Sequence, residues 1–322
     1  MRRARRRSSA SGRRSSPGVD PVSAAAKGAA KLDGLAVGVM LLLCTAWGVQ
    51  QVASKVAPTQ GMPPVFQALV RSLVAGPLVI GWLGLRRGRV GLSSLFQADG
   101  TWRAGAVTAV LFAAEFVLLF EGVQRTSASR AVIILYTAAF FTAAGAHFAI
   151  PGERLRLVNA LGLLLAFVGV AATMGGGGPA GSIWDDLMVL GAAAAWGATT
   201  VIVKQSRALI SAAPEKVLAY QHIGAIPLLL GAALVSGQWR VPEASALAWA
   251  SLLYQCVVVA FASYLTWFWL IGRYPAGRLA AFSFLTPLFG VVASALLLGE
   301  SVTPLLLAGL VCVGAGLRLV NR

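Results

Sequence analysis

One segment of this chain occurs twice, first as Ala46-Trp47-Gly48-Val49-Gln50-Gln51-Val52-Ala53-Ser54-Lys55. It is apolar enough to lie inside a membrane, yet it carries two amides and one ammonium group. Trp196, Gly197 and Lys204 repeat its Trp-Gly pair and its lysine 149 positions later. Two further matches have nearly the same offset, Glu153 with Glu300 and Arg130 with Arg278. Matches at one offset indicate an internal duplication of about 149 residues.

The composition is typical of a polytopic helical membrane protein. Of 322 residues, 57% are hydrophobic and only 12% are charged, whereas a soluble chain carries roughly 25% charged residues. Several segments contain no Asp, Glu, Lys or Arg and are as long as the roughly 20 residues of helix that cross a bilayer. These segments are 131–152, 157–184, 244–272 and 279–299.

The net charge of +16 does not indicate a nucleic-acid partner. Residues 1–32 hold nine of the 27 Lys and Arg residues and have no apolar period. We expect them to form a disordered cytoplasmic tail that contacts anionic lipid. A secretory or twin-arginine signal is the alternative, which the long gap before the first apolar run disfavours. The three cysteines lie in apolar segments without zinc-like spacing, so neither a disulfide framework nor a metal site is expected.

The apolar runs predict an all-α fold of ten transmembrane helices, five on either side of a glycine-rich linker at 175–182. The first repeat then covers 33–174 and the second covers 183–322. The expected helices are Leu35–Ala57, Pro64–Leu85, Trp102–Gln124, Ser127–Ile150, Arg156–Met174, Ile183–Lys204, Pro214–Ser236, Ala246–Gly272, Gly277–Leu298 and Pro304–Val320.

The distribution of positive charge predicts the orientation. With the tail inside, 22 Lys and Arg residues lie on the cytoplasmic side and three on the opposite side. Both termini are therefore predicted to be cytoplasmic and the linker external. Because each repeat has an odd number of helices, the second repeat starts on the opposite side from the first. Such inverted repeats are typical of secondary transporters, whose solute site lies near mid-membrane.

Motifs at matching places in the two repeats resemble those of a known family. Trp47-Gly48 with Lys55, followed by Pro63-Pro64 and Arg71, resembles the start of an EamA repeat of the drug/metabolite transporter superfamily. The second repeat has similar motifs in Tyr264–Leu270, Leu285–Leu288 and Leu298–Glu300. The resemblance extends from Leu35 to the C-terminus. It implies ten helices, a central cavity lined by the first four of each repeat, peripheral fifth and tenth helices, and export or exchange of small metabolites.

One position departs from the pattern of this family. The fourth expected helix has Tyr136-Thr137 where the ninth has Thr286-Pro287. The proline that would break the fourth helix is missing, which argues against a symmetric hinge in the two repeats.

Ionisable side chains inside a bilayer are costly and mark functional or paired positions. Arg71 lies seven residues after Pro64, roughly 10 Å from the outer surface, with Gln67 one turn away on the same face. Arg71 is either a bidentate clamp for a solute carboxylate or part of a structural ion pair. In the first helix, Trp47, Gln51 and Lys55 lie in one stripe. We interpret Lys55, at its end, as a side chain that extends its ammonium group to the membrane interface.

Glu115 is expected near the midplane of the membrane. It lies twelve residues after Arg103, about 18 Å along a helix that crosses a core of about 30 Å. Arg71 reaches a similar depth on the preceding helix, so we predict that the two side chains pair when the site is empty. A solute carboxylate that takes Arg71 would free Glu115 to bind a proton. The alternative is a purely structural pair.

The second repeat contributes a polar set of its own. His222 lies eight residues after Pro214, and Tyr264 lies eight residues before Gly272, so both should lie at a similar depth from the inner side. Tyr220 is two residues from His222. The alternative for His222 is an ordinary hydrogen-bonded core histidine.

These patterns predict a secondary transporter that exports or exchanges a small metabolite, amino acid or drug-like solute by alternating access in the plasma (inner) membrane. A membrane-embedded enzyme built on Glu115 and His222, and a non-saturating channel or scaffold, are the alternatives. No cofactor is expected, and a homodimer is an open alternative. The candidate substrate-binding residues are Arg71, Gln67, Gln51, Trp47, Tyr264, His222 and Tyr220, with Glu115 as the candidate for proton coupling.

Overall fold

The structure is a computed structural model, and it describes residues 33–150, 157–175, 182–271, 273–274, 283 and 285–320. The tail at 1–32, the landmarks Glu153 and Arg278 and most of the linker lie outside the described residues. So does the expected start of the ninth helix at Gly277. Within the described part of the chain, every regular element is a helix.

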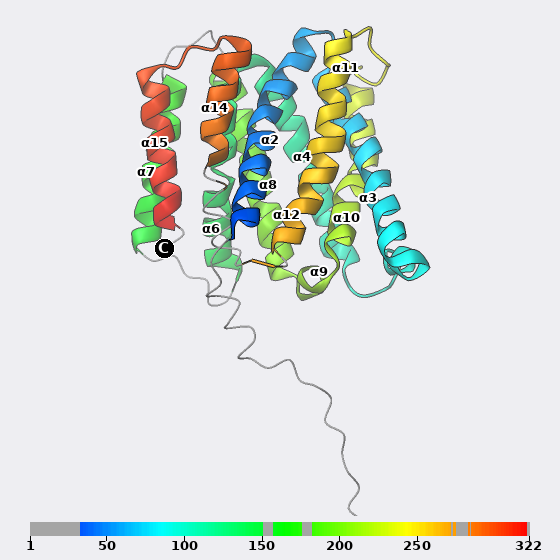
Figure 1. Ribbon diagram of the computed structural model, residues 1–322. Helices are drawn as coiled ribbons and strands as arrows, with labels where there is room; N and C mark the ends of the chain where they lie inside the picture. Colours follow the sequence, from blue (N-terminus) through cyan, green and yellow to red (C-terminus); the bar gives the residue numbers. More distant parts are fainter. Residues whose placement is uncertain are drawn as a thin grey trace, which may run out of the picture.

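The helices stand roughly side by side in one bundle (Figure 1). Seven spans in the described chain are long and apolar enough to cross a membrane, and Leu285–Leu298 is a shorter apolar helix. The elements are α2 (Gly34–Thr59), α3 (Pro64–Ser94), α4 (Trp102–Arg125), α5 (Ala128–Leu135), α6 (Ala138–Ala149), α7 (Leu157–Gly175), α8 (Ile183–Gln205), α9 (Arg207–Ser211), α10 (Pro214–Val235), α11 (Ala246–Leu253), the π-helix η1 (Tyr254–Ser263), α12 (Tyr264–Ile271), α14 (Leu285–Leu298) and α15 (Pro304–Val320).

The second helix is longer than the apolar run predicts, because α3 continues beyond Leu85. Gly88 interrupts it with φ 56° and ψ −150°, a conformation that glycine adopts without steric cost. The short segment after Gly88 turns back, so that Gly91 packs against Leu83. The polar end of α3 therefore lies beside the bundle rather than extending its length.

The expected fourth span, Ser127–Ile150, is present, but it divides into α5 and α6 at Tyr136 and Thr137 although the proline is missing. The Thr137 amide donates to the Ile134 carbonyl over 3.0 Å, and the Thr137 hydroxyl donates to the same carbonyl over 2.6 Å. A threonine side chain that bonds the preceding turn competes with the regular helical ladder. This local competition replaces the proline.

The duplicated Trp-Gly motif forms equivalent contacts in the two repeats. A Cβ added at Gly48 of α2 would lie 2.7 Å from the Gly290 nitrogen of α14. A Cβ added at Gly197 of α8 would lie 2.6 Å from the Phe141 Cβ of α6. Each glycine thus permits close approach of a helix from the other repeat, which is how small residues act at helix interfaces in membranes. The repeats therefore pack through exchanged, matching surfaces.

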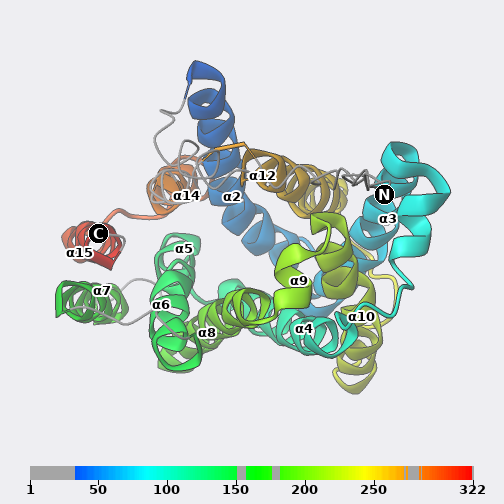
Figure 2. The same ribbon diagram turned by 90° about the horizontal axis from the view of Figure 1, so that it is seen from below.

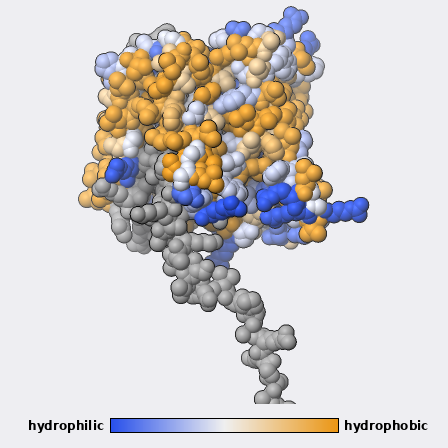
Figure 3. Space-filling view, viewed as in Figure 1, coloured by the Kyte–Doolittle hydropathy of each residue, from blue (hydrophilic) through white to orange (hydrophobic). Residues whose placement is uncertain are grey.

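The bundle has two ends, which we name by α2. The proximal end is where α2 begins at Gly34, and the distal end is where α2 ends at Thr59. Helices α7 and α15 form a pair at the edge of the bundle (Figures 1 and 2), joined closely where Gly169 meets Cys312. Hydrophobic residues cover most of the visible side of the molecule, and hydrophilic ones gather near the proximal end (Figure 3). This is the distribution expected of a protein surrounded by lipid.

Candidate functional site

Arg71 is the largest fully buried side chain of the described structure, with 0% exposure. Its guanidinium carbon lies 3.9 Å from the centre of the Phe116 ring, and its Nη2 donates to the Tyr264 hydroxyl over 3.0 Å. Nε and Nη1 have no hydrogen-bond partner among the described residues. Nε and Nη1 lie on opposite sides of the guanidinium, and each shares an edge with Nη2, which carries two N–H groups. The edge that the Tyr264 bond does not use therefore keeps two parallel donors open for an anion.

Aromatic rings form the walls around this guanidinium. His222 of α10 contacts Phe112 of α4 edge to face at 4.9 Å and stacks on Tyr264 at 6.4 Å. His222 and Tyr264 therefore meet, as their predicted depths require. The His222 ring approaches the backbone of Ala260, but neither of its nitrogens makes a well-formed hydrogen bond within the described chain. The guanidinium, the imidazole and the phenol therefore form one cluster, in which Arg71 and His222 are fully buried and Tyr264 is half-buried.

A chain of amides crosses the bundle one helical turn away from Arg71. The Gln255 Nε2 of η1 donates to the Gln67 Oε1 of α3 over 3.1 Å, and the Ser54 hydroxyl of α2 donates to the Gln255 Oε1 over 3.4 Å. Ser54, Gln67 and Gln255 are all fully buried. Gln51, one turn before Ser54, is also buried, and its Oε1 has no partner among the described residues. Sequence reasoning missed Gln255.

The π-helix η1 explains how Gln255 and Tyr264 both reach α3. They are nine residues apart, which in an α-helix at roughly 100° per residue would place them on opposite faces. The wider turns of a π-helix, closed by i→i+5 bonds, change this phase. Gln255 then contacts Gln67, and Tyr264 contacts Arg71 one turn further along α3. The only signal in the sequence was a glutamine within an apolar run.

The predicted pair of Arg71 and Glu115 is wrong in this conformation. Glu115 is nearly buried, with 7% exposure, and it interacts electrostatically with Arg71. However, no hydrogen bond or ion pair within 4.0 Å joins the two described side chains. The physical reason is helical phase. Phe116, the next residue on α4, lies against the guanidinium, and consecutive residues of a helix point about 100° apart, so Phe116 and Glu115 cannot both face it.

Three other predicted residues lie outside this cluster or at its border. Trp47 donates from Nε1 to the Ser263 hydroxyl over 2.8 Å and so ties α2 to η1. Tyr220 bonds Thr101 over 2.8 Å at the proximal end, away from Arg71. Lys55 does not simply extend to an interface, because its Nζ donates to the Thr126 carbonyl at the distal end.

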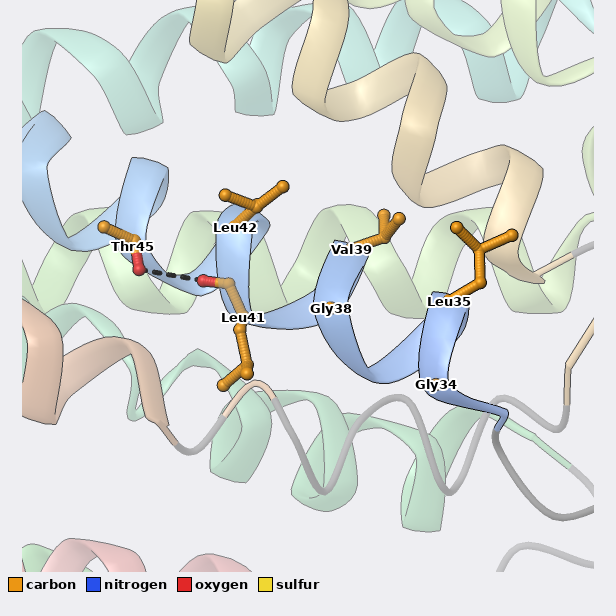
Figure 4. Close-up of a pocket in the computed structure, with 7 residues that line it drawn as sticks. All are labelled: Gly34, Leu35, Gly38, Val39, Leu41, Leu42 and Thr45. Atoms are coloured by element: carbon orange, nitrogen blue, oxygen red, sulfur yellow. Dashed lines mark hydrogen bonds between the residues drawn. The ribbon is translucent and has the colours of Figure 1, made fainter.

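A shallow groove of about 540 Å³ lies along the proximal half of α2. Its lining is apolar apart from Thr45, whose hydroxyl donates to the Leu41 carbonyl of the same helix over 2.8 Å (Figure 4). None of the described residues that line it is ionisable. A groove of this chemistry fits lipid chains better than a polar solute, so the candidate site remains the Arg71 cluster.

Comparisons with known proteins identify the family of the chain. The family model described as "EamA-like transporter family" matches residues 34–175 and again 183–322. "Uncharacterized transporter YvbV" of Bacillus subtilis is 30% identical over 294 residues, which cover 88% of this chain and 90% of that protein. A "Probable amino-acid metabolite efflux pump" of Salmonella typhimurium is 31% identical over 291 residues, covering 87% and 92%.

The fold is also found in a solved structure. A protein crystal structure superposes with a TM-score of 0.61 at 20% identity and covers 88% of this chain and 95% of that chain. At this level of identity the likeness concerns the fold alone. The two family matches, one on each repeat, and the relatives that align along nearly their whole length give the same result. This multi-pass membrane protein belongs to the EamA-like transporter family.

Proposed function

We propose that this protein is a secondary transporter that exports or exchanges a small carboxylate-bearing metabolite, and that Arg71 binds the carboxylate. The observation that carries the proposal is the open edge of a fully buried guanidinium. An unpaired buried cation is strongly unfavourable, and an anionic solute would supply the missing partner. The name of the Salmonella relative, an "amino-acid metabolite efflux pump", supports a solute of this chemistry.

The proposed mechanism is alternating access between two inverted repeats of five helices. The exchanged Gly48 and Gly197 contacts support a pseudo-symmetric arrangement in which the repeats rock against each other. The proposed orientation has both termini in the cytoplasm of a plasma membrane, with the distal end outside. A cysteine placed at Gly177 should be labelled by an impermeant thiol reagent in intact cells. Labelling only after permeabilisation would reverse the orientation.

Glu115 is proposed to couple transport to protons. It is near enough to interact electrostatically with Arg71 yet is not bonded to it, so the occupancy of Arg71 by an anion changes the field at the carboxyl group. Proton binding at Glu115 would then accompany solute binding. Glu115→Gln is expected to bind solute while flux loses its pH dependence. Unchanged pH dependence in this variant would remove the coupling role.

Purified full-length protein in liposomes tests the function directly. We expect saturable solute flux without chemical turnover, whereas turnover without flux would indicate an enzyme and non-saturating flux a channel. Comparing metabolites inside and outside cells, with and without the gene, identifies the solute. Arg71→Lys keeps the charge but loses the fork, so KM should rise about 10-fold or more. Arg125→Lys, at an exposed arginine of the distal end, is the matched control and should leave KM unchanged.

A further inference from the structure

We propose that Gln51 is a specificity-determining residue of the solute site and that Gln255 is its positioning residue. Gln51 would accept a hydrogen bond from a donor group beside the solute's carboxylate. The inference rests on the proposed function, since it takes Arg71 as the carboxylate partner. It adds a requirement on the solute, namely a second polar group of the donor type.

Gln51 and Arg71 lie at a similar depth in the bundle. Gln255 bridges Ser54 of α2 and Gln67 of α3, so these two residues lie at one level. Helices α2 and α3 run in opposite directions because a short turn joins them at the distal end. Gln51 precedes Ser54 by three residues and Arg71 follows Gln67 by four, which moves both toward the proximal end by about 5 Å. Gln51 and Arg71 therefore lie on the same side of the amide chain.

Gln51 and Arg71 both keep hydrogen-bonding atoms without a partner in the described chain. The side-chain nitrogen of Gln255 donates to the Gln67 oxygen, and the Gln255 side-chain oxygen accepts from Ser54. On the proximal side of this chain, the Gln51 Oε1 accepts no hydrogen bond and the Arg71 Nε and Nη1 donate none within the described chain. A buried polar atom without a partner is unfavourable. An open acceptor and open guanidinium donors thus lie at a similar depth, which is complementary to a carboxylate with a neighbouring N–H or O–H group.

Gln255 acts on the site through the helices that carry it. Its bond to Gln67 fixes α3 one turn from Arg71, while Tyr264, from the same π-helical segment, bonds Arg71 itself. Gln255 does not reach the open edge of the guanidinium. Its amide chain closes the distal side of the Arg71 cluster and holds the helices that carry Gln51 and Arg71 in register.

Binding of matched probes to the full-length protein tests the proposal. The probes are L-alanine with propanoate, L-leucine with 4-methylpentanoate, and L-phenylalanine with 3-phenylpropanoate, each pair differing in the ammonium group. For a pair that binds, we expect the wild type to favour the amino member at least about 10-fold, because one unsatisfied buried acceptor accounts for that ratio. Gln51→Leu should bring the ratio close to one. Gln50→Leu removes the same amide from the neighbouring position and should preserve the ratio.

A double-mutant cycle tests the positioning residue. Gln255→Leu and Gln67→Leu should each weaken binding of both members of a pair, whereas the double variant should lose no more than either single one, because the partners are removed together. Additive losses would refute the positioning role of Gln255. Equal binding of amino and deamino probes by the wild type would refute the role of Gln51 and leave Arg71 as the carboxylate partner. Binding of no probe would overturn the carboxylate site as well.

Discussion

At the distal end, the Asp186 carboxylate accepts a 2.6 Å hydrogen bond from Thr126 and pairs with Arg130. At the proximal end, by contrast, the Asp33 carboxylate accepts one side-chain hydrogen bond, from Tyr274 over 2.9 Å. The two places are equivalent in the duplication. Asp33 caps the start of α2, and Ser182, 149 positions later, caps the start of α8. Asp186 is fully buried, but Asp33 is exposed.

The distal contacts also join more parts of the chain. Lys55 of α2 donates to the Thr126 carbonyl, and Glu300, after α14, accepts from the Ala128 and Ser129 amides over 2.8 and 3.0 Å. Charges in buried hydrogen-bonded networks are strongly coupled, whereas an exposed bond is screened by water. The starts of the two duplicated helices, α2 and α8, are therefore held by different side-chain contacts. We propose that in the transport cycle the distal contacts hold that end closed in this conformation.

The largest expected effect is at Asp186. Asp186→Asn removes the charge that faces Arg130 in a buried pair, which costs about 3–5 kcal/mol when one partner is lost. We expect a fall in Tm of several degrees in detergent, measured by thermal unfolding. Asp185→Asn is the matched control, because Asp185 caps the helix start and faces an Arg125 that is 53% exposed. Equal Tm shifts in the two variants would contradict a special contribution of the buried Asp186 pair at the distal end.

A smaller loss is expected at Glu300. Its carboxylate binds the first two amides of α5 and the Ser129 hydroxyl at 2.7 Å, so it acts as the N-terminal cap of a helix from the other repeat. Glu300→Ala should cost about 1–2 kcal/mol. Glu300→Gln retains an acceptor and should lose less. An alanine variant as stable as the wild type would show that this contact does not help to close the distal end.

The proximal bond should matter little. Tyr274→Phe removes the hydroxyl that donates to Asp33 and leaves the Asp33 cap on the Ala36 amide in place. Because the pair is exposed, we expect Tm to change by about 1 °C or less and liposome flux to stay normal. A destabilisation as large as that of Asp186→Asn would mean that both ends are closed with similar strength.

The smallest effect is a pH dependence at the proximal loop between α3 and α4. Hydrogen bonds from Thr101 and Lys216 lower the pKa of Asp99 from 3.8 to about 2, because they favour the carboxylate. A lowered folded-state pKa stabilises the protein above the unfolded value and loses this contribution as pH falls toward 2. The Tm difference between wild type and Asp99→Asn should therefore be constant from pH 7 to about 5 and shrink below about 4. A difference that grows in acid would contradict the assignment.

Much of the site could be predicted from the sequence, because a polar residue in an otherwise apolar run has few solvated alternatives. Arg71, Gln67, Gln51, Tyr264 and His222 stand out in this way, and the structure joins Arg71 to Tyr264 and Tyr264 to His222 in the candidate site. Their partners could not be predicted in the same way. Residue counting placed Arg71 and Glu115 at one depth but could not show that Phe116, and not Glu115, would lie against the guanidinium.

The sequence by itself determined the helical membrane class and the duplication, because hydrophobic length and periodicity are local properties of the chain. Only the tertiary structure decided which faces meet. The π-helical phase of η1 brought Gln255 and Tyr264 to α3 together, and the break at Thr137 formed without proline. Both depend on which backbone and side-chain groups find hydrogen-bond partners after the helices pack. That choice is made between segments far apart in the sequence, where hydropathy carries no information.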